Sequence, residues 1–477
     1  MLEQQYMEQC YQKLLEAGYP EDRIIKDYRL LEGLRTDFAI LPPGLNSLPM
    51  IIIEVKHNLN TGNKWLKTDH AKKIQKDFDL HCYVYCAEDN LFIDIESSEV
   101  NKPIDKILSY DELQDIWLQS RTYISSLQLE NFMLFKSAEF HFGSKLNIII
   151  GENGSGKTQL MKLLYAIARS FVYVPSRKED RIDYSRLELD KTFGVRNISE
   201  LISYSIKEKS KETKIVFSLS GQGEKTEFQI KNNPKDTLIY PAFHSLETLF
   251  SIHHNSNNAV FLPTNELLSI FPGFMSMQQV YRDNWPYDQT YVDTIKYLGL
   301  PPIQSQGKLY KELIQEVEKA IHGHIYLNEQ GTRFLMQMEK SKTILEIPIV
   351  DTGWRKMGQL LQLINTGLIY PGSILLWDEP DANLNPKLIC LVAKVLLKLS
   401  LAGVQVFIAT HSLFLLRELE YLSHEQNATD SIRYIALGEE GVEQSDNTAD
   451  LHNILSFEEE IKQEDRIIAW GKRKDTK

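Results

Sequence analysis

The sequence predicts a two-module α/β protein, and three observations support that prediction. The chain has 477 residues, which is more than one ordinary domain needs and agrees with two or three. In the first hundred residues, apolar runs typical of strands alternate with helical spacing in the order αβββαββ. A second strand–helix alternation starts at Ile124 and is strong again from Asp351 to about Leu437. We therefore expect a small module over residues 1–115 and a larger one over 116–477.

Composition and charge are those of a globular protein and leave nucleic-acid binding open. The chain is 43% hydrophobic and 25% charged. Its apolar runs are shorter than the ~20 residues needed to span a bilayer, so no membrane partner is expected. The stretch MLEQQYMEQCYQ has neither a basic leader nor a signal-peptide core, which predicts a cytoplasmic protein. The net charge of −12 excludes a uniformly basic coat, whereas phosphate binding needs only a local basic surface.

The elements of the first module follow from residue spacing. Residues 3–17, EQQYMEQCYQKLLEA, have helical apolar spacing, and GYP ends that helix. Strands are predicted around 24–31, at RTDFAIL and at MIIIEVK, with a PPG turn before the last. A helix at KTDHAKKIQKDFD then leads to the strands HCYVYCA and LFIDI. Cys82 and Cys86 lie on one face of the first of these and are predicted to be buried thiols. Residues 100–122 are predicted to form a helical connector.

The second module begins with three predicted strands, SLQLENFMLF, SAEFHF and KLNIII, followed by the helix TQLMKLLYAIARSFVY. An insert of about 176–350 comes next. Its predicted elements are a strand pair at TKIVFSLSG and KTEFQIKN, an apolar segment AVFLPTNELLSIFPGF, a helix at KLYKELIQEVEKAI and a meander of HIYLN, RFLMQME and TILEIPIV. Since no apolar heptad persists over several repeats, no coiled-coil arm is predicted. The charged C-terminal segment is predicted to be a helix with a frayed tail.

The stretch GENGSGKT matches the consensus G-x-x-x-x-G-K-[ST] at every defined position, after a strand and before a helix. Its glycines allow backbone N–H groups to curl around a β-phosphate. Lys157 reaches the β- and γ-phosphates, and the Thr158 hydroxyl is placed for Mg²⁺. The sequence therefore predicts ATP and Mg²⁺ as cofactors. The predicted nucleotide contacts are Gly151, Glu152, Asn153, Gly154, Ser155, Gly156, Lys157 and Thr158.

Two later strands end in groups that suit ATP hydrolysis. SILLWDEPDANLNP is an apolar strand that ends in Asp378 and Glu379. We expect Asp378 to hold the Mg²⁺ shell and Glu379 to polarise the attacking water. A further strand, VQVFIATHS, ends at His411, well placed to contact a γ-phosphate.

Together these motifs resemble the ABC-type ATPase head, and more narrowly the soluble heads of OLD-like and other defence ATPases, over about residues 124–437. The resemblance implies ATP sandwiched between two heads, and hence a homodimer. It also places an LSGGQ-type signature where this chain has DTGWRKMGQLLQL, so Thr352, Gly353 and Lys356 would take that role. A Q-loop glutamine is not assigned. The motif segments are 151–158, 351–361, 373–380 and 406–412.

The strand MIIIEVK raises a separate question, because burying either Glu54 or Lys56 alone would be costly. Side chains two apart on a strand face the same way, and Asp37 in RTDFAI lies on the predicted neighbouring strand. Two carboxylates and a lysine at a strand edge can hold Mg²⁺ and activate a water molecule. The ion would also offset the burial of the carboxylates. An ordinary surface ion pair remains the alternative.

The pattern D…E-V-K resembles the PD-(D/E)xK nuclease superfamily. The order αβββαβ resembles the N-terminal nuclease domain of type I restriction motor subunits. The resemblance implies Asp37, Glu54 and the Val55 carbonyl as ligands of Mg²⁺ or Mn²⁺, and Lys56 as the residue that orients the water. Among supporting residues, Gln75 would match the family's glutamine, and Glu8 or Glu16 would match its upstream helical acid.

The two motif sets predict an ATP-hydrolysing, ATP-gated, Mg²⁺-dependent endonuclease that acts on DNA as a homodimer. Resemblance to fused defence ATPases implies a role against phage or other foreign DNA. One alternative is a defence sensor or scaffold ATPase with a non-cleaving N-terminal domain and a separate effector protein as partner. A break-repair ATPase and an RNA-cutting toxin are the other two.

Overall fold

The structure is a computed structural model in which the chain divides near Arg121 into two compact units, Met1–Arg121 and the bulk of Thr122–Lys477. Each unit is described by itself. The structure describes residues 2–29, 35–41, 49–68, 71, 81–95, 102–104, 106–119, 123–172, 188–202, 212–220, 225–231, 238–241, 258–281, 285–303, 308–438, 441–451, 459, 462–463 and 465–468.

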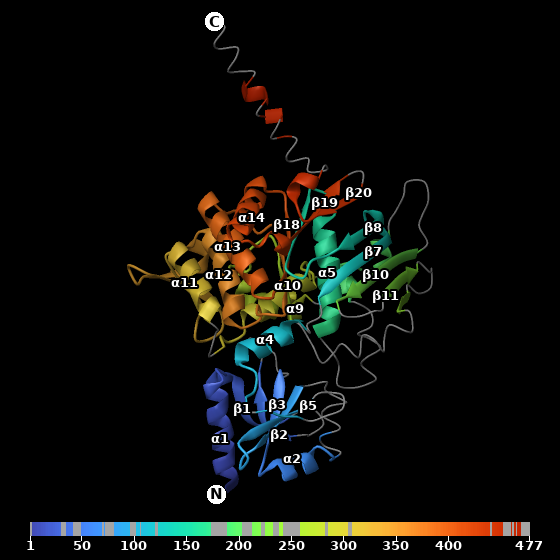
Figure 1. Cartoon of the computed structure of the whole chain (residues 1–477). Coiled ribbons are helices and arrows are strands. Elements are labelled where there is room, and N and C mark those ends of the chain that lie inside the picture. Colours follow the sequence, from blue (N-terminus) through green and yellow to red (C-terminus); the bar gives the residue numbers. More distant parts are fainter. Residues whose placement is uncertain are drawn as a thin grey trace. The chain divides into compact units, whose positions relative to one another are not determined.

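The first unit is built on one mixed six-stranded sheet (blue to cyan in Figure 1). Its elements are α1 (Leu2–Glu16), β1 (Ile24–Arg29), β2 (Arg35–Ile40), β3 (Ile51–Lys56), α2 (Leu59–Trp65), β4 (His81–Cys86), β5 (Leu91–Ile95), β6 (Lys102–Ile104) and α4 (Tyr110–Gln119). The spatial order is β1-β2-β3-β4-β5-β6, in which β3 and β4 run parallel and the other neighbours antiparallel. The predicted first helix and the five predicted strands are present, and β6 is an additional edge strand.

Helix α2 is an element that the apolar spacing does not predict. Asn58 caps it, since its side chain accepts from the backbone N–H of Thr61 while the Thr61 hydroxyl accepts from that of Asn58. This reciprocal cap is a sequence signal for a helix start in N-L-N-T. The helix predicted at KTDHAKKIQKDFD lies mostly outside the described residues.

Strand register places the acidic residues of the first unit side by side. Antiparallel pairing of Phe38 with Ile53 and of Ala39 with Ile52 brings the next positions, Asp37 and Glu54, opposite each other. Because side chains alternate along a strand, both share the face of Ala39 and Ile52. That face carries the apolar cluster next to α2, which also holds the buried thiols of Cys82 and Cys86.

The second unit has a central six-stranded sheet. In spatial order its strands are β13 (Ala259–Leu262), β17 (Ile374–Asp378), β18 (Gln405–Thr410), β9 (Leu146–Gly151), β19 (Ile432–Gly438) and β20 (Gly441–Ser445). The first five run parallel, and β20 is antiparallel at the edge. The carboxyl ends of these parallel strands therefore meet at one edge, which is where open α/β sheets bind their ligands.

A five-stranded antiparallel sheet and a smaller three-stranded one complete the strands of the second unit. The five-stranded sheet contains β12 (Leu238–Pro241), β11 (Lys225–Lys231), β10 (Glu212–Leu219), β7 (Ile124–Phe132) and β8 (Phe135–His141). The three-stranded sheet contains β14 (Gly323–Leu327), β15 (Phe334–Met338) and β16 (Ile344–Glu346). The last predicted strand, TILEIPIV, is shorter than expected, because Pro348 lacks a backbone N–H and lies in a 3-10 turn, Ile347–Ile349.

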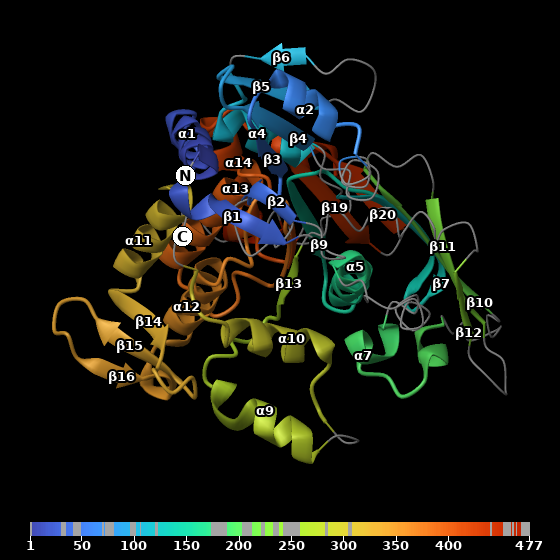
Figure 2. The ribbon, with the colours of Figure 1, turned by 90° about the horizontal axis from the view of Figure 1, so that it is seen from below.

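Helices cover both faces of the central sheet (Figures 1 and 2). The helices described in this unit are α5 (Lys157–Val172), α7 (Leu189–Phe193), α9 (Phe271–Val280), α10 (Gln289–Leu298), α11 (Lys308–Ala320), α12 (Thr352–Asn365), α13 (Pro386–Leu401) and α14 (Leu413–Glu425). Figure 2 shows α5 between the central sheet and the strands β7, β10 and β11. Within the described residues, no helix is long and apolar enough to cross a membrane.

Alternation along the central strands explains this arrangement of layers. Ile148 and Ile150 of β9 belong to the apolar core shared with α10 to α14. Ile149, between them, belongs to the other core, shared with α5 and the antiparallel sheet. A continuous apolar run is what burial on both faces requires, and Ile148, Ile149 and Ile150 form such a run in β9.

Candidate functional site

The loop between β9 and α5 has the conformation of a phosphate cradle. Gly154 and Gly156 have φ of +83° and +98°, which residues with a Cβ rarely adopt. A Cβ on Gly156 would lie 2.8 Å from Cζ of Phe135, so the aromatic ring also requires a glycine there. The loop opens directly into the 16-residue helix α5, whose N-terminal N–H groups favour an anion.

The side chain of Lys157 lies back over this loop. Its Nζ donates to the carbonyls of Gly151 and Glu152, at 2.7 and 2.9 Å. Burial lowers the pKa of Lys157, whereas the carboxylates of Glu379, Asp378 and Glu152 act in the opposite direction. The ammonium therefore lies beside the backbone N–H groups of the loop. A phosphate bound there would contact both the ammonium and the N–H groups.

Asp378, at the end of β17, faces the start of α5. Its Oδ2 accepts from the Thr158 hydroxyl at 2.8 Å, and its buried Oδ1 has no hydrogen-bond partner among the described residues. Burial raises the pKa of Asp378, more than the Thr158 hydrogen bond lowers it. A hydroxyl beside a carboxylate with an unsatisfied oxygen is a donor set that suits Mg²⁺ and its waters. The residues present therefore fit the predicted ion.

Glu379 and His411 lie together at the same edge of the sheet. The backbone N–H of Glu379 donates to the carbonyl of Ala409 at 2.9 Å, which joins the ends of β17 and β18. Nδ1 of His411 lies 3.3 Å from Oε1 of Glu379. Glu379 has φ of +48°, an uncommon left-handed conformation for a residue with a side chain. The structure thus brings Asp378, Glu379 and His411 next to the phosphate loop.

The segment after β13 also reaches this edge, and sequence reasoning missed it. Because β13 pairs in parallel with β17, the carboxyl end of β13 lies beside the carboxyl end of β17, where Asp378 is located. Burial raises the pKa of Tyr291, the charge of Asp288 raises it further, and that of Asp378 contributes least. A pocket of roughly 320 Å³ is lined by Thr264, Asn265, Tyr291, Thr352, Lys356 and Asn383, among others. No local signal identifies P-T-N-E, because the parallel pairing joins strands more than a hundred residues apart.

The signature-like segment forms the start of α12. The Asp351 side chain accepts from the backbone N–H of Gly353 at 2.8 Å and caps the helix. Arg355 forms a buried ion pair with Glu266 at 2.9 Å, which ties α12 to the segment after β13. Thr352 is partly exposed at the helix start, whereas Lys356 is buried and donates to the carbonyls of Glu379 and Ala382. As placed, Lys356 points into its own head and not towards the ATP of a partner head.

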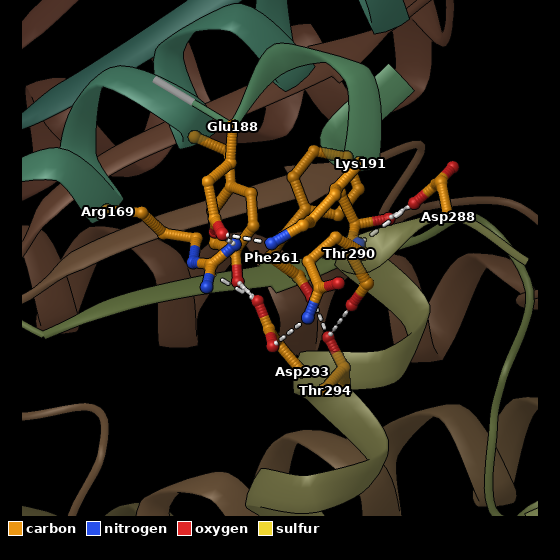
Figure 3. A network of polar contacts seen from close by, with 10 residues as sticks. Arg169, Glu188, Lys191, Phe261, Asp288, Thr290, Asp293 and Thr294 are labelled. Carbon is orange, nitrogen blue, oxygen red and sulfur yellow. Dashed lines mark hydrogen bonds and ion pairs between the residues drawn. The ribbon is translucent and has the colours of Figure 1, made fainter. Parts of the chain in front are cut away.

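A polar network joins α5 to α10 and α7 (Figure 3). Nζ of Lys162 lies 2.6 Å from Oδ2 of Asp288, at the start of α10. One helical turn further on, Asp293 accepts from the Tyr165 hydroxyl at 2.8 Å and pairs with Arg169 at 3.2 Å. These bonds fix α10 against the phosphate-loop helix.

The first unit brings Asp37, Glu54 and Lys56 together. Nζ of Lys56 lies 2.7 Å from Oε2 of Glu54 and 3.8 Å from Oδ2 of Asp37. Oδ2 of Asp37 also accepts from the backbone N–H of Val55 at 2.7 Å. Glu54 is buried, and the ring of Trp65 lies 5.4 Å from the ammonium. An ammonium held between two carboxylates shows that the site accommodates a cation, and carboxylate oxygens suit Mg²⁺ or Mn²⁺.

The supporting residues predicted for this site lie elsewhere or outside the described residues. Gln75 is outside them. Glu8 and Glu16 are exposed on α1, where Glu8 pairs with Lys26 at 3.6 Å. Within the part of the chain that the structure describes, no three His, Cys, Asp or Glu side chains gather as a metal site. An ion here would therefore need the Val55 carbonyl or water as further ligands.

Comparison with known proteins agrees with the geometry of the second unit. Residues 123–343 match the family model described as "AAA ATPase domain". Residues 357–417 match the model described as "AAA domain, putative AbiEii toxin, Type IV TA system". The DNA replication and repair protein RecF of Bacillus thuringiensis (strain Al Hakam) and that of Bacillus cereus (strain B4264) are each 33% identical over 100 residues, 20% of this chain. The chain spans only a quarter of the length of these relatives, 25% in each case.

Solved structures were compared as well. A SmcHead bound to the C-winged helix domain of ScpA has a TM-score of 0.41 at 13% identity, covering 68% of this chain and 97% of that one. The SMC head domain from Thermotoga maritima has a TM-score of 0.37 at 12% identity, covering 68% and 98%. The second unit therefore has a mixed α/β P-loop fold, and over residues 123–343 it is similar to AAA ATPase domains.

Proposed function

We propose that this ATPase controls a Mg²⁺-dependent nuclease located in the first unit, and that the substrate is DNA. The observation that supports the nuclease is the convergence of Asp37 and Glu54 on the ammonium of Lys56. One unit thus offers groups for phosphodiester hydrolysis, and the other offers a phosphate loop, a lysine and carboxylates that suit ATP hydrolysis. A chain that combines the two can make cutting depend on nucleotide.

In the second unit, each predicted residue has a task that its position supports. The phosphate loop and Lys157 bind the phosphates, and Thr158 and Asp378 would hold Mg²⁺, which offsets the negative charge of the transferred phosphoryl group. Glu379 accepts a proton from the attacking water, and His411 orients the Glu379 carboxylate at 3.3 Å while facing the γ-phosphate position. Asn265, three residues after β13, is a further polar group and lines the same pocket as Thr352 and Lys356.

In the first unit, Asp37, Glu54 and the Val55 carbonyl would hold the ion, which stabilises charge on the scissile phosphate. Lys56 then leaves its present pairing with Glu54, because a divalent ion and an ammonium compete for the same carboxylates. Freed from Glu54, the ammonium orients the attacking water and stabilises the pentacoordinate phosphate.

DNA as substrate and a head-to-head homodimer are further parts of the proposal. The RecF relatives carry DNA replication and repair in their names, and they match about 100 residues of this chain. Thr352 and Gly353 at the start of α12 would contact ATP bound to a second head, as the resemblance to ABC-type heads implies. Closure of two heads around ATP would bring two first units to one DNA. A role in defence is part of the same proposal.

Cleavage assays test this function directly. Purified full-length protein is incubated with Mg²⁺ or Mn²⁺ and with linear, circular and single-stranded DNA or RNA, with and without ATP. Lys56→Ala and Lys157→Ala are the two variants. We expect DNA cleavage that requires ATP and is lost in both, with ATP hydrolysis retained by Lys56→Ala. If Lys157→Ala still cleaves DNA, cleavage does not depend on ATP. If the protein cleaves RNA and no DNA, its substrate is RNA.

A second candidate is a sensor or scaffold ATPase whose first unit binds a partner effector protein without cutting. The 2.7 Å contact between Lys56 and the buried carboxylate of Glu54 favours it, because a closed ion pair can be purely structural. Absence of cleavage on every substrate, with ATP hydrolysis intact, would establish this alternative over the nuclease.

A further inference from the structure

Lys356 is a buried lysine whose charge is met by backbone carbonyls. Its side chain is 3% exposed, and its Nζ donates to the carbonyl of Glu379 and, at 3.2 Å, to that of Ala382. Among the described residues, no carboxylate lies within ion-pair distance of this ammonium. Burying an ammonium without a paired carboxylate is costly, so such a residue is expected to have a task other than stability.

The two carbonyls belong to the turn that carries Glu379. This residue is in the left-handed region, with φ of +48°, where its Cβ crowds the backbone. Its N–H is bound by the carbonyl of Ala409, and its own carbonyl is bound by Lys356. Both peptide groups that flank the strained residue are therefore held, one by β18 and the other by α12.

The same turn is anchored again a few residues later. Oδ1 of Asp381 accepts from the Thr410 hydroxyl at 2.7 Å, and the Ala382 carbonyl accepts from Lys356. Asn383, which follows, also has a positive φ of +63°. The ammonium thus bridges the first and fourth residues of a turn with two left-handed positions. Without it, the Glu379 carbonyl would keep only the backbone N–H of Ala382, at 3.2 Å, and the turn would lose its link to α12.

We infer that Lys356 is a positioning residue for ATP hydrolysis, which holds Glu379 in the left-handed conformation that aims its carboxylate at the attacking water. The inference rests on the proposed role of Glu379. Lys356 lies one helical turn after Thr352. It therefore links the exposed start of α12 to Glu379, the proposed general base. A shift of α12 would move the Glu379 carboxylate without touching the nucleotide.

The test compares Lys356→Met and Lys356→Gln in the full-length protein. Met removes all donors at similar volume, whereas Gln keeps a neutral donor of shorter reach. Lys398→Met on α13, which breaks an ion pair with Glu316 outside the site, is the matched control. The measurements are amide hydrogen exchange over residues 379–385, and kcat and KM for ATP. Thermal unfolding is followed in parallel.

We expect Lys356→Met to raise hydrogen exchange in residues 379–385 and to lower kcat by about 10- to 100-fold, since a displacement of about 1 Å can cost that much. KM for ATP should change by less than about threefold. Lys356→Gln should lie between Met and wild type, and Lys398→Met should match wild type. If Lys356→Met does not fold, Lys356→Gln decides by the same two measurements.

Unchanged exchange over residues 379–385 in Lys356→Met would overturn the inference, as would a loss confined to KM. These failures are distinct from failure of the proposed function. If the wild type hydrolyses no ATP, the proposed ATPase role falls, while hydrogen exchange still decides whether Lys356 holds the turn.

Discussion

The two acidic sites of this protein satisfy their carboxylates in opposite ways. In the second unit, Asp378 is buried with one oxygen bound by Thr158 and the other without a partner among the described residues. In the first unit, Glu54 is just as buried, but Lys56 lies 2.7 Å from it and the Val55 N–H binds Asp37. One site is arranged for a cation from outside, whereas the other has a cation of its own. The comparison teaches that burial of an acid does not by itself indicate a metal.

The largest effect should come from the phosphate loop. We expect Lys157→Ala to lower kcat/KM for ATP hydrolysis by about 100- to 1,000-fold, because the residue supplies positive charge where negative charge develops. A steady-state ATPase assay measures this. Lys162→Ala on the same helix, which faces Asp288 at 2.6 Å, is a control that should retain nucleotide binding. Equal rates for Lys157→Ala and wild type would contradict the assignment of the site.

A pH effect of similar size should come from Lys356. Burial lowers its pKa to about 8. Between that value and its unfolded pKa near 10.5, the unfolded chain binds the extra proton, so the stability of the second unit should rise with pH. The full rise is on the order of 3 kcal/mol. Urea unfolding between pH 7.5 and 10 should show that the free energy of unfolding rises with pH in wild type and not in Lys356→Met. The same pH dependence in both proteins would contradict this prediction.

The next largest effect concerns the stability of the first unit. Glu54→Gln should destabilise it by about 2 kcal/mol without added metal, because Lys56 loses the carboxylate that it pairs with. Thermal unfolding in the presence of EDTA measures this, and Glu88→Gln is a surface control, since Glu88 is about half exposed. A variant as stable as wild type would show that the ion pair contributes nothing.

The smallest effect has the opposite sign. Asp378→Asn should stabilise metal-free protein by about 1 kcal/mol, because the change removes a buried charge whose Oδ1 has no partner among the described residues. The same unfolding experiment measures it. If Glu54→Gln and Asp378→Asn lower the free energy of unfolding equally, the two carboxylates do not differ in how they are satisfied.

Much of the fold could be predicted because its signals are local. GENGSGKT predicts the end of a strand, a loop and the start of a helix. The apolar run before Asp378 and Glu379 predicts the end of a second strand. The strands around Asp37 and Glu54 follow from short apolar runs bounded by the PPG turn. The role of each of these residues stays a prediction, although the structure places them together.

The remainder depends on contacts between distant parts of the chain. The segment that carries Asn265 lies at the carboxyl end of the sheet only because β13 pairs with β17, and no local sequence pattern predicts that parallel pairing. Lys356 is predicted to belong to the signature, whereas its side chain binds a turn 23 residues later in the chain, which no local pattern predicts. Helix α2 was missed although its capping box is local, because its apolar spacing is poor.

Metal binding to nucleotide-free protein tests the central claim, that the first unit holds a divalent ion between Asp37 and Glu54. Equilibrium titration with Mn²⁺, followed by electron paramagnetic resonance, counts the bound ions in wild type, Asp37→Asn, Glu54→Gln and Asp378→Asn. We predict a saturable site that is lost in Asp37→Asn and Glu54→Gln and retained in Asp378→Asn. Binding that is the same in wild type, Asp37→Asn and Glu54→Gln would leave Lys56 as the only cation at these carboxylates and contradict the nuclease.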